Sequence, residues 1–195
     1  MTRTLFNLNW LANRLLRAVG VAGLILLLGA NRGIGEDASF TEYQVKALFL
    51  LNFAKYVDWP SETFPDPDSP IIIGILGKDP FGDKLEHAVR GKAVNGHAFL
   101  IKHLASSNDL KDCQILFISD SEAGKLDEIL SKSKTLPILT VGEDKTFWED
   151  GGIIDLVLKD DRVRLRIDLK AADQAGLKVS SKLLAVADEV KGKAE

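Results

Sequence analysis

The chain has 195 residues, 46% of them hydrophobic, which is enough to build one domain with a full core. Its formal net charge is −3 at pH 7, and it would be −7 without the first 35 residues, which hold four arginines and no acid. So acidic a domain is a poor nucleic-acid binder, and the single cysteine, Cys113, excludes an intrachain disulfide.

The first 35 residues predict a secretory signal peptide. Arg3, Arg14 and Arg17 precede the apolar run AVGVAGLILLLGA, and the small residues of GIG follow it. The run is shorter than the ~20 apolar residues that span a bilayer. We therefore predict export, cleavage near Gly35, no stable membrane insertion of the product, and one domain over residues 36–195. An uncleaved N-terminal anchor is the alternative.

An apolar helix is predicted to open the domain. The segment SFTE, residues 39–42, has the pattern of a capping box and predicts the first turn. The following YQVKALFLLNFAKYVDWP is apolar around most of its circumference, and Pro60 predicts that the helix ends at Trp59. Its broad apolar side, which includes Phe49 and Phe53, is expected to pack on a sheet.

Three large apolar residues, Leu48, Leu51 and Trp59, are predicted to point away from that side. We predict that they contact either a protein partner or a second subunit, which would make the protein a homodimer. The alternative is burial beneath the proline-rich connector PSETFPDPDSP, which follows the helix.

Short apolar runs alternating with helical stretches predict a parallel sheet with helices on both faces. The predicted strands lie in IIIGIL, HAFLIKHL, CQILFIS and LPILTV, and the predicted helices in DPFGDKLEHAV and SEAGKLDEILSKSK. In the first of these helices, Asp79 is expected to cap and Pro80 to begin the helix. Cys113, at the edge of an apolar run, is expected to be buried.

The C-terminal part, in GIIDLVLKDDRVRLRIDL, predicts an antiparallel hairpin around a tight turn at Asp160 and Asp161. Alternation places Val163, Leu165, Ile167 and Leu169 on one face and Arg162, Arg164, Arg166 and Asp168 on the other. Two helical pieces follow, the first ending at Gly176 and the second capped by Ser180 or Ser181. The predicted fold class is therefore α/β: a mainly parallel sheet of about four strands flanked by helices on both faces, extended by a C-terminal antiparallel hairpin and terminal helices.

Motifs for catalysis or metal binding are absent from the sequence. GILGKDPFG lacks the spacing of either phosphate-binding glycine motif, and no G-x-S-x-G elbow occurs. His97 and His103 would lie roughly 20 Å apart on one strand and cannot share a metal ion. We therefore predict no catalytic residues, no metal, no cofactor and no enzymatic activity.

Two groups of residues are candidates for binding. The first lies beyond the carboxyl ends of predicted strands, where ligands of parallel α/β sheets gather. Its members are Gly77, Lys78, Asp79, Ser119 and Asp120. Turn and cap chemistry is the alternative for this predicted ligand pocket. The second group, a candidate for binding an anion or an acidic partner, is the arginine row Arg162, Arg164 and Arg166. Its alternative is an exposed face with local pairing to Asp155 or Asp168.

Four blocks stand out in order along the chain: EYQVKALFLLNFAKYVDWP, IGILGKDPFG, CQILFISDSE and RVRLRIDLKAADQAGLKVSSKLL. In this order and spacing they resemble the YfiR (HmsC-like) family of periplasmic proteins. The resemblance covers nearly all of residues 40–190, and the last block is the most specific.

The resemblance implies a small α/β periplasmic protein that restrains a membrane-anchored diguanylate cyclase by binding its periplasmic part. Loss of that restraint would raise cyclic di-GMP, exopolysaccharide production and biofilm formation. Well-known relatives use cysteine pairs, but this chain has only Cys113, so an intramolecular disulfide switch is not implied. Some relatives serve other envelope sensor systems, so a periplasmic small-molecule-binding sensor component is the alternative function.

Overall fold

The computed structural model describes residues 41–192, so the predicted signal peptide lies outside the described residues. The helices are α2 (Glu42–Tyr56), α3 (Asp83–Val89), α4 (Leu126–Ser133), α5 (Leu169–Gln174) and α6 (Ser181–Leu184), with 3₁₀ turns at Ser61–Thr63, Leu110–Asp112 and Asp120–Lys125. The strands are β1 (Val57–Asp58), β2 (Ile71–Leu76), β3 (Ala93–Val94), β4 (His97–Leu104), β5 (Ile115–Ile118), β6 (Leu139–Gly142), β7 (Ile154–Lys159), β8 (Arg162–Asp168), β9 (Lys178–Val179) and β10 (Glu189–Lys191). None of the described helices combines the length and apolar character that a membrane crossing needs.

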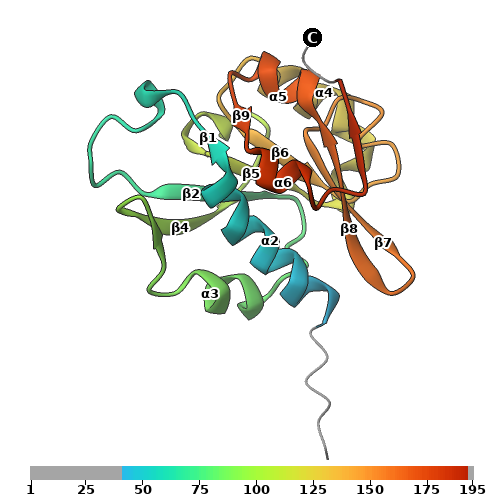
Figure 1. Cartoon of the computed structure of the whole chain (residues 1–195), viewed down its shortest axis with the longest axis horizontal. Helices are drawn as coiled ribbons and strands as arrows, with labels where there is room; N and C mark the ends of the chain where they lie inside the picture. The colour runs from blue at the N-terminus through green and yellow to red at the C-terminus, as the bar shows by residue number, and fades with distance from the viewer. Residues whose placement is uncertain (1–40, 193–195) are drawn as a thin grey trace, which may run out of the picture. The chain divides into compact units, whose positions relative to one another are not determined.

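The main sheet has the strand order β10-β8-β7-β6-β5-β2-β4-β3. Figure 1 shows the strands from β8 to β4 in this sheet. Strands β4, β2, β5, β6 and β7 run parallel to one another. Strand β8 runs antiparallel to β7, and β10 runs parallel to β8. Strands β1 and β9 form a separate antiparallel pair. The predicted fold class is confirmed, and the structure adds four short strands that the sequence did not predict: β1, β3, β9 and β10.

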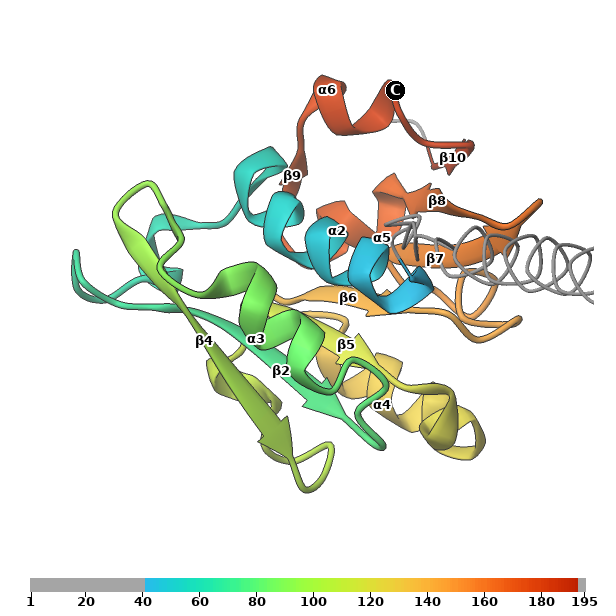
Figure 2. The same cartoon turned by 90° about the horizontal axis from the view of Figure 1, so that it is seen from below.

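Helices cover both faces of the sheet, with α2 and α3 on one face and α4 on the other (Figure 2). The larger core, on the α2 face, contains the fully buried Phe53 and Phe117. A smaller cluster, on the α4 face, contains Leu116 and Ile129. Because β2 and β5 are covered on both faces, their residues are apolar almost without alternation.

Helix α2 starts and ends at different residues from those predicted. The Thr41 hydroxyl accepts a hydrogen bond from the Gln44 N–H at 3.4 Å, and Gln44 Oε1 accepts one from the Thr41 N–H at 2.7 Å. The predicted capping box at residues 39–42 is therefore wrong, because the same pattern recurs two residues later and is the one that forms. The helix ends at Tyr56 rather than Trp59, because the chain there enters the β1–β9 pair.

The predicted start of α3 is also wrong. Asp79 does not cap a helix; its Oδ1 accepts the N–H of Phe81 at 2.7 Å, in the turn that follows β2. Gly82 then takes a positive φ of 57°, which interrupts any helix that would begin at Pro80. The helix therefore starts at Asp83.

The C-terminal hairpin forms as predicted. Asp160 and Asp161 have φ values of 51° and 56°, the left-handed pair that a two-residue turn matched to twisted strands requires. Leu169, predicted to continue the apolar face of the strand, instead begins α5. The reason is that the Asp168 side chain caps this helix, with Oδ1 accepting the Ala171 N–H at 3.0 Å.

Three smaller predictions are confirmed. Gly176, with φ of 72°, follows α5, and the Ser180 hydroxyl accepts the Lys182 N–H at the start of α6. Cys113 is buried at 2% exposure, and a Cβ on Gly74 would lie only 2.6 Å from its sulfur. Burial raises the pKa of the Cys113 thiol to about 11.

The packing of Phe147 gives a test of the fold. A Cβ on Gly152 would lie 2.1 Å from the buried Phe147 ring. We expect Gly152→Ala to lower the free energy of unfolding by about 1–3 kcal/mol, because the ring would have to shift. Gly124→Ala is the matched control, since nothing lies within 4 Å of a Cβ there. Urea denaturation measures both variants, and equal stabilities would contradict this packing.

Candidate partner-binding surface

Two grooves flank the N-terminal half of α2. The α2–α3 groove has a volume of about 420 Å³ and is lined by Gln44, Leu48, Asp83, Lys84, His87 and Ala88. The α2–hairpin groove has a volume of about 370 Å³ and is lined by Glu42, Val45, Phe49, Leu158, Asp161, Arg162 and Val163. Since Gln44 and Leu48 lie on one flank of α2 and Val45 and Phe49 on the other, the grooves share the helix as a common ridge.

This ridge with its two grooves exposes apolar side chains between charged ones. Leu48 on α2 is 38% exposed, and Leu158 near the hairpin tip is 52% exposed. Figure 1 shows α2 between α3 and the β7–β8 hairpin, and Leu158 of the hairpin lines a groove with residues of α2, the helix that carries Leu48. Exposed apolar residues rimmed by charges are typical of surfaces that bind other proteins.

Only one of the three apolar residues predicted to face a partner is exposed. Leu51 is 7% exposed and belongs to the core, so the prediction that it points away from the core is wrong. The reason is that α2 contacts α3 and α6 as well as the sheet, so more than one of its sides is buried. Trp59 is half-buried, and its Nε1 donates to the carbonyl of Gln114 at 3.2 Å.

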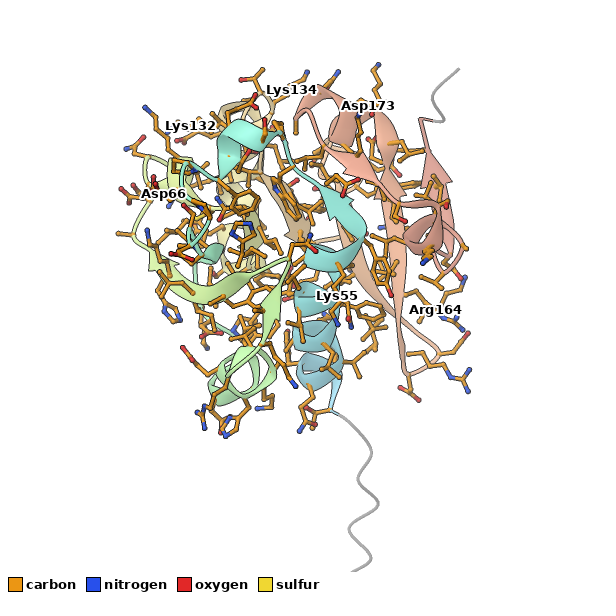
Figure 3. All side chains as sticks on the ribbon, turned by 60° about the vertical axis from the view of Figure 1, so that its left-hand side comes forward. Lys55, Asp66, Lys132, Lys134, Arg164 and Asp173 are labelled. Carbon is orange, nitrogen blue, oxygen red and sulfur yellow. The ribbon has the colours of Figure 1, made fainter. Side chains whose placement is uncertain are left out.

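The arginine row divides between two environments. Arg162 is exposed and lines the α2–hairpin groove. Arg166 pairs with the fully buried Asp155, with Nε donating to Oδ2 at 2.9 Å, and its guanidinium lies 4.9 Å from the centre of the Trp148 ring. Arg164 lies between them on the hairpin, half-buried (Figure 3). Local pairing therefore accounts for Arg166, and Arg162 is the arginine that faces a groove.

The five residues of the predicted ligand pocket lie at the carboxyl ends of the adjacent parallel strands β2 and β5. From β2 the chain continues to β4, and from β5 it continues to β6, on the opposite side of the β2–β5 pair. Open α/β sheets bind their ligands at such a point, beyond the carboxyl ends of two strands from which the chain turns in opposite directions. The Lys78 N–H donates to Ser121 Oγ at 2.8 Å, and that hydroxyl lies 3.2 Å from Ser119 Oγ. A Cβ on Gly77 would lie 2.5 Å from the same Ser121 oxygen. The Lys78 N–H and the hydroxyls of Ser119 and Ser121 therefore hydrogen-bond to one another, which agrees with the alternative of turn and cap chemistry.

The two acids of that group have other partners or neighbours. His103 Nε2 lies 2.8 Å from Asp79 Oδ2, beside the Phe81 N–H bond described above. Burial raises the pKa of Asp120, and the neighbouring Asp144 carboxylate adds to the effect. Within residues 41–192, no group of three or more His, Cys, Asp or Glu side chains could hold a metal ion.

A buried ion-pair network at the start of α2 was missed by the sequence analysis. Lys46, 2% exposed, pairs with Glu42 at 2.5 Å and with Glu143, which follows β6. The Tyr43 hydroxyl donates to Glu143 Oε1 at 3.2 Å. Burial, together with Glu143, raises the pKa of Tyr43 to about 12, and burial raises the pKa of Glu143 although Lys46 opposes it. The one signal in the sequence was Lys46, a lysine in the middle of an apolar helix side.

The network fixes the part of α2 that carries both grooves. We expect Lys46→Met to lower the free energy of unfolding by about 3–5 kcal/mol, because Glu143 would remain as an unpaired buried carboxylate. The double variant Lys46→Met/Glu143→Leu should recover most of the loss, and Lys55→Met, at an exposed lysine of the same helix, is the control.

The stability of the Lys46→Met variant should depend on pH. The pKa of Glu143 is already raised in the parent protein, and removal of Lys46, which opposes the rise, would raise it further. The folded variant would then bind the proton more tightly than the unfolded chain, so its stability falls as pH rises through the raised pKa. Lys46→Met should therefore regain stability on acidification toward the ordinary glutamate pKa of about 4.3. Denaturation curves between pH 7 and pH 4 measure this, and a Lys46→Met protein as stable as the parent would contradict the network.

Solved structures similar to this chain include two with low sequence identity to it. One is the conserved domain protein from Vibrio cholerae O1 biovar El Tor strain N16961, with 13% identity and a TM-score of 0.52. The other is the ABC domain in complex with L-Trp from Streptococcus pneumonia, with 12% identity and a TM-score of 0.50. Each comparison covers 77% of this chain and 60% of the other chain, so this chain spans about 60% of either structure's length. At these identities the similarity shows the fold alone. No curated protein sequence matches the chain.

A family profile gives a more specific match than these structures do. The profile of the YfiR/HmsC-like proteins matches residues 43–188, from the first turn of α2 to the residue before β10. The matched range includes almost the whole of both grooves and the residues Tyr43, Lys46 and Glu143 of the buried network. Because the match extends over more than half of the chain, the protein belongs to the YfiR/HmsC-like family.

Proposed function

We propose that this protein is a periplasmic regulatory binding protein that restrains a membrane-anchored diguanylate cyclase by binding its periplasmic part. Membership of the YfiR/HmsC-like family supports a periplasmic regulator of such a cyclase at the level of the family. The observation that carries the proposal for this chain is the α2 ridge with a groove on each side. In this proposal the N-terminal signal peptide exports the chain, and loss of the protein raises cyclic di-GMP, exopolysaccharide and biofilm.

The ridge suits a protein partner more than a small substrate. Both grooves are open to solvent, and Leu48 and Leu158 lie at the surface between charged side chains. Apolar residues at the centre of an interface supply binding free energy, whereas rim charges steer association and select the partner. Arg162, exposed at the edge of the α2–hairpin groove, would meet an acidic side chain of the partner.

The histidines support a binding role over a catalytic one, because each already has a structural contact. His97 stacks on Phe64 with ring centres 4.3 Å apart, and His103 pairs with Asp79. His87 Nδ1 lies 2.7 Å from the carbonyl of Asp83, within its own helix. His97 Nδ1 also lies 2.7 Å from the backbone carbonyl of Ser69. None of these contacts joins a histidine to a serine hydroxyl or a cysteine thiol, which nucleophilic catalysis would need.

Charge placed on the ridge should release the cyclase. We expect Leu48→Glu to fold normally and to weaken partner binding by about 10–100-fold, because a carboxylate would be buried against apolar surface. Val186→Glu is the matched control, since Val186 is 64% exposed and lines neither groove. The measurement is cyclic di-GMP in a strain that expresses the cyclase and carries each variant in place of the parent gene.

In that strain, deletion of the gene and Leu48→Glu should both raise cyclic di-GMP, whereas Val186→Glu should not. Unchanged cyclic di-GMP on deletion would overturn the proposed function. A rise on deletion but not with Leu48→Glu would keep the function and remove the α2 ridge as its binding surface.

A second candidate is a small-molecule-binding sensor of another envelope signalling system. It is favoured by the position of the predicted ligand pocket, which lies beyond the carboxyl ends of β2 and β5. From these two strands the chain turns in opposite directions along the sheet, and ligands of open α/β sheets bind at such points. A structure with a similar fold, the ABC domain from Streptococcus pneumonia, is in complex with L-Trp.

A ligand screen by thermal shift tests this candidate. A compound that binds at the strand ends should raise the unfolding temperature of the parent protein but not of Asp79→Ala or Ser119→Ala. Equal shifts in all three proteins would place the compound elsewhere on the molecule.

A further inference from the structure

A cleft lies between α4 and α5, away from the α2 ridge. The α4–α5 cleft has a volume of about 370 Å³, within the range of ligand pockets in proteins, and it is more enclosed than either groove beside α2. None of its lining residues lines those grooves, and none belongs to the predicted ligand pocket at the ends of β2 and β5. The cleft is therefore a separate candidate site.

The floor of the cleft is apolar. It is formed by four side chains that are each 7% exposed or less: Leu130, Ile138, Ile153 and Ala175. Burial of apolar surface is favourable, so this floor can bind an apolar group of a ligand.

The buried polar residues of the lining already have partners within the protein. The Ser133 hydroxyl donates to a backbone carbonyl at 3.2 Å, and the Thr140 hydroxyl accepts a backbone N–H at 3.0 Å. The Asp168 carboxylate pairs with Lys191 at 3.4 Å. Recognition of a ligand's charges therefore falls to the exposed residues at the rim of the cleft.

The rim carries two positive and two negative side chains. They are Lys134 and Lys170, and Asp127 and Asp150, all exposed. Among residues 41–192, none of the four takes part in a salt bridge. A ligand with only negative charge would meet both aspartates, and a ligand with only positive charge would meet both lysines. The rim is therefore complementary to a ligand that carries a charge of each sign.

The wall formed by α4 sets the separation of those two charges. Asp127, Leu130, Ser131 and Lys134 are spaced so that they follow one side of the helix, with the acid at one end and the lysine at the other. Seven residues of helix span about 10.5 Å along the axis. An extended chain covers about 3.3–3.6 Å per residue, so about three residues match that distance. Figure 3 shows Lys134 at the end of the molecule where Asp173 of α5 also lies.

We propose that the α4–α5 cleft binds a short extended peptide of about three residues with free termini. Its amino terminus pairs with Asp127 and its carboxylate with Lys134, while an apolar side chain between them covers Leu130. Ser131 on one wall and Gln174 on the other can exchange hydrogen bonds with the amide groups of the peptide. The site goes beyond the proposed regulatory function and does not depend on it.

Calorimetric titration of the parent protein with Ala-Leu-Ala tests the site. The free tripeptide should bind about 10-fold more tightly than N-acetyl-Ala-Leu-Ala, which lacks the amino-terminal charge. It should also bind about 10-fold more tightly than the carboxyl-terminal amide of the same peptide, because each blocked form loses one charge-assisted hydrogen bond.

Two variants identify the residues that bind the termini. Lys134→Gln should bind the free peptide about 10-fold more weakly but the amide as the parent does, because the amide has no carboxylate to lose. In the same way, Asp127→Asn should lose only the preference over the acetylated peptide. Lys132→Gln and Asp173→Asn are the matched controls, since both residues are exposed on the same two helices and neither lines the cleft.

Equal binding of the free, acetylated and amidated peptides would overturn the proposal, and so would the absence of Ala-Leu-Ala binding at millimolar concentration. If Lys134→Gln kept the preference for the free carboxylate, the placement of the peptide along α4 would be wrong. Leu48→Glu should bind the peptide as the parent does, because Leu48 lies outside the cleft. Failure of the peptide site is thus distinguishable from failure of the regulatory function.

Discussion

The position of α2 depends on one buried contact, the ion pair of Lys46 with Glu143. A lysine at 2% exposure is tolerated only if its charge is matched, and Glu143, Glu42 and the ring of Tyr43 surround it. Glu143 follows β6 directly, so the contact joins the first turns of α2 to the carboxyl edge of the sheet. The depth at which α2 sits then decides which of its residues are core, such as Leu51, and which form the ridge, such as Leu48.

The rest of the molecule is a buried scaffold that carries the α2 ridge. Strands β2 and β5 are covered on both faces, and the turns at their ends are joined by hydrogen bonds among Lys78, Ser119 and Ser121. The α2 ridge lies over one face of this scaffold (Figure 2). A regulator of the proposed kind needs a rigid frame and a surface that its target recognises.

The parts that the sequence predicted are those with a strong local pattern. The parallel strands follow from their apolar runs, and the hairpin from strict alternation around Asp160 and Asp161. The short strands β1, β3, β9 and β10 were missed because two or three residues have no periodicity. Leu51 was misplaced because α2 is covered by α3 and α6 as well as by the sheet, so more than one of its sides is buried. The Lys46–Glu143 pair was missed because it joins residues 97 positions apart. Such contacts exist only once the chain has folded.

The position of Cys113 against Gly74 has a consequence for how the protein matures. With its thiol buried and its pKa raised to about 11, almost none of this cysteine is thiolate at neutral pH, and the thiolate is the form that exchanges with disulfides. The catalysts that insert disulfide bonds into exported proteins would find no reactive sulfur in the folded domain. Because the chain can form no internal disulfide, we expect the stability of the folded domain to be the same in oxidising and reducing surroundings.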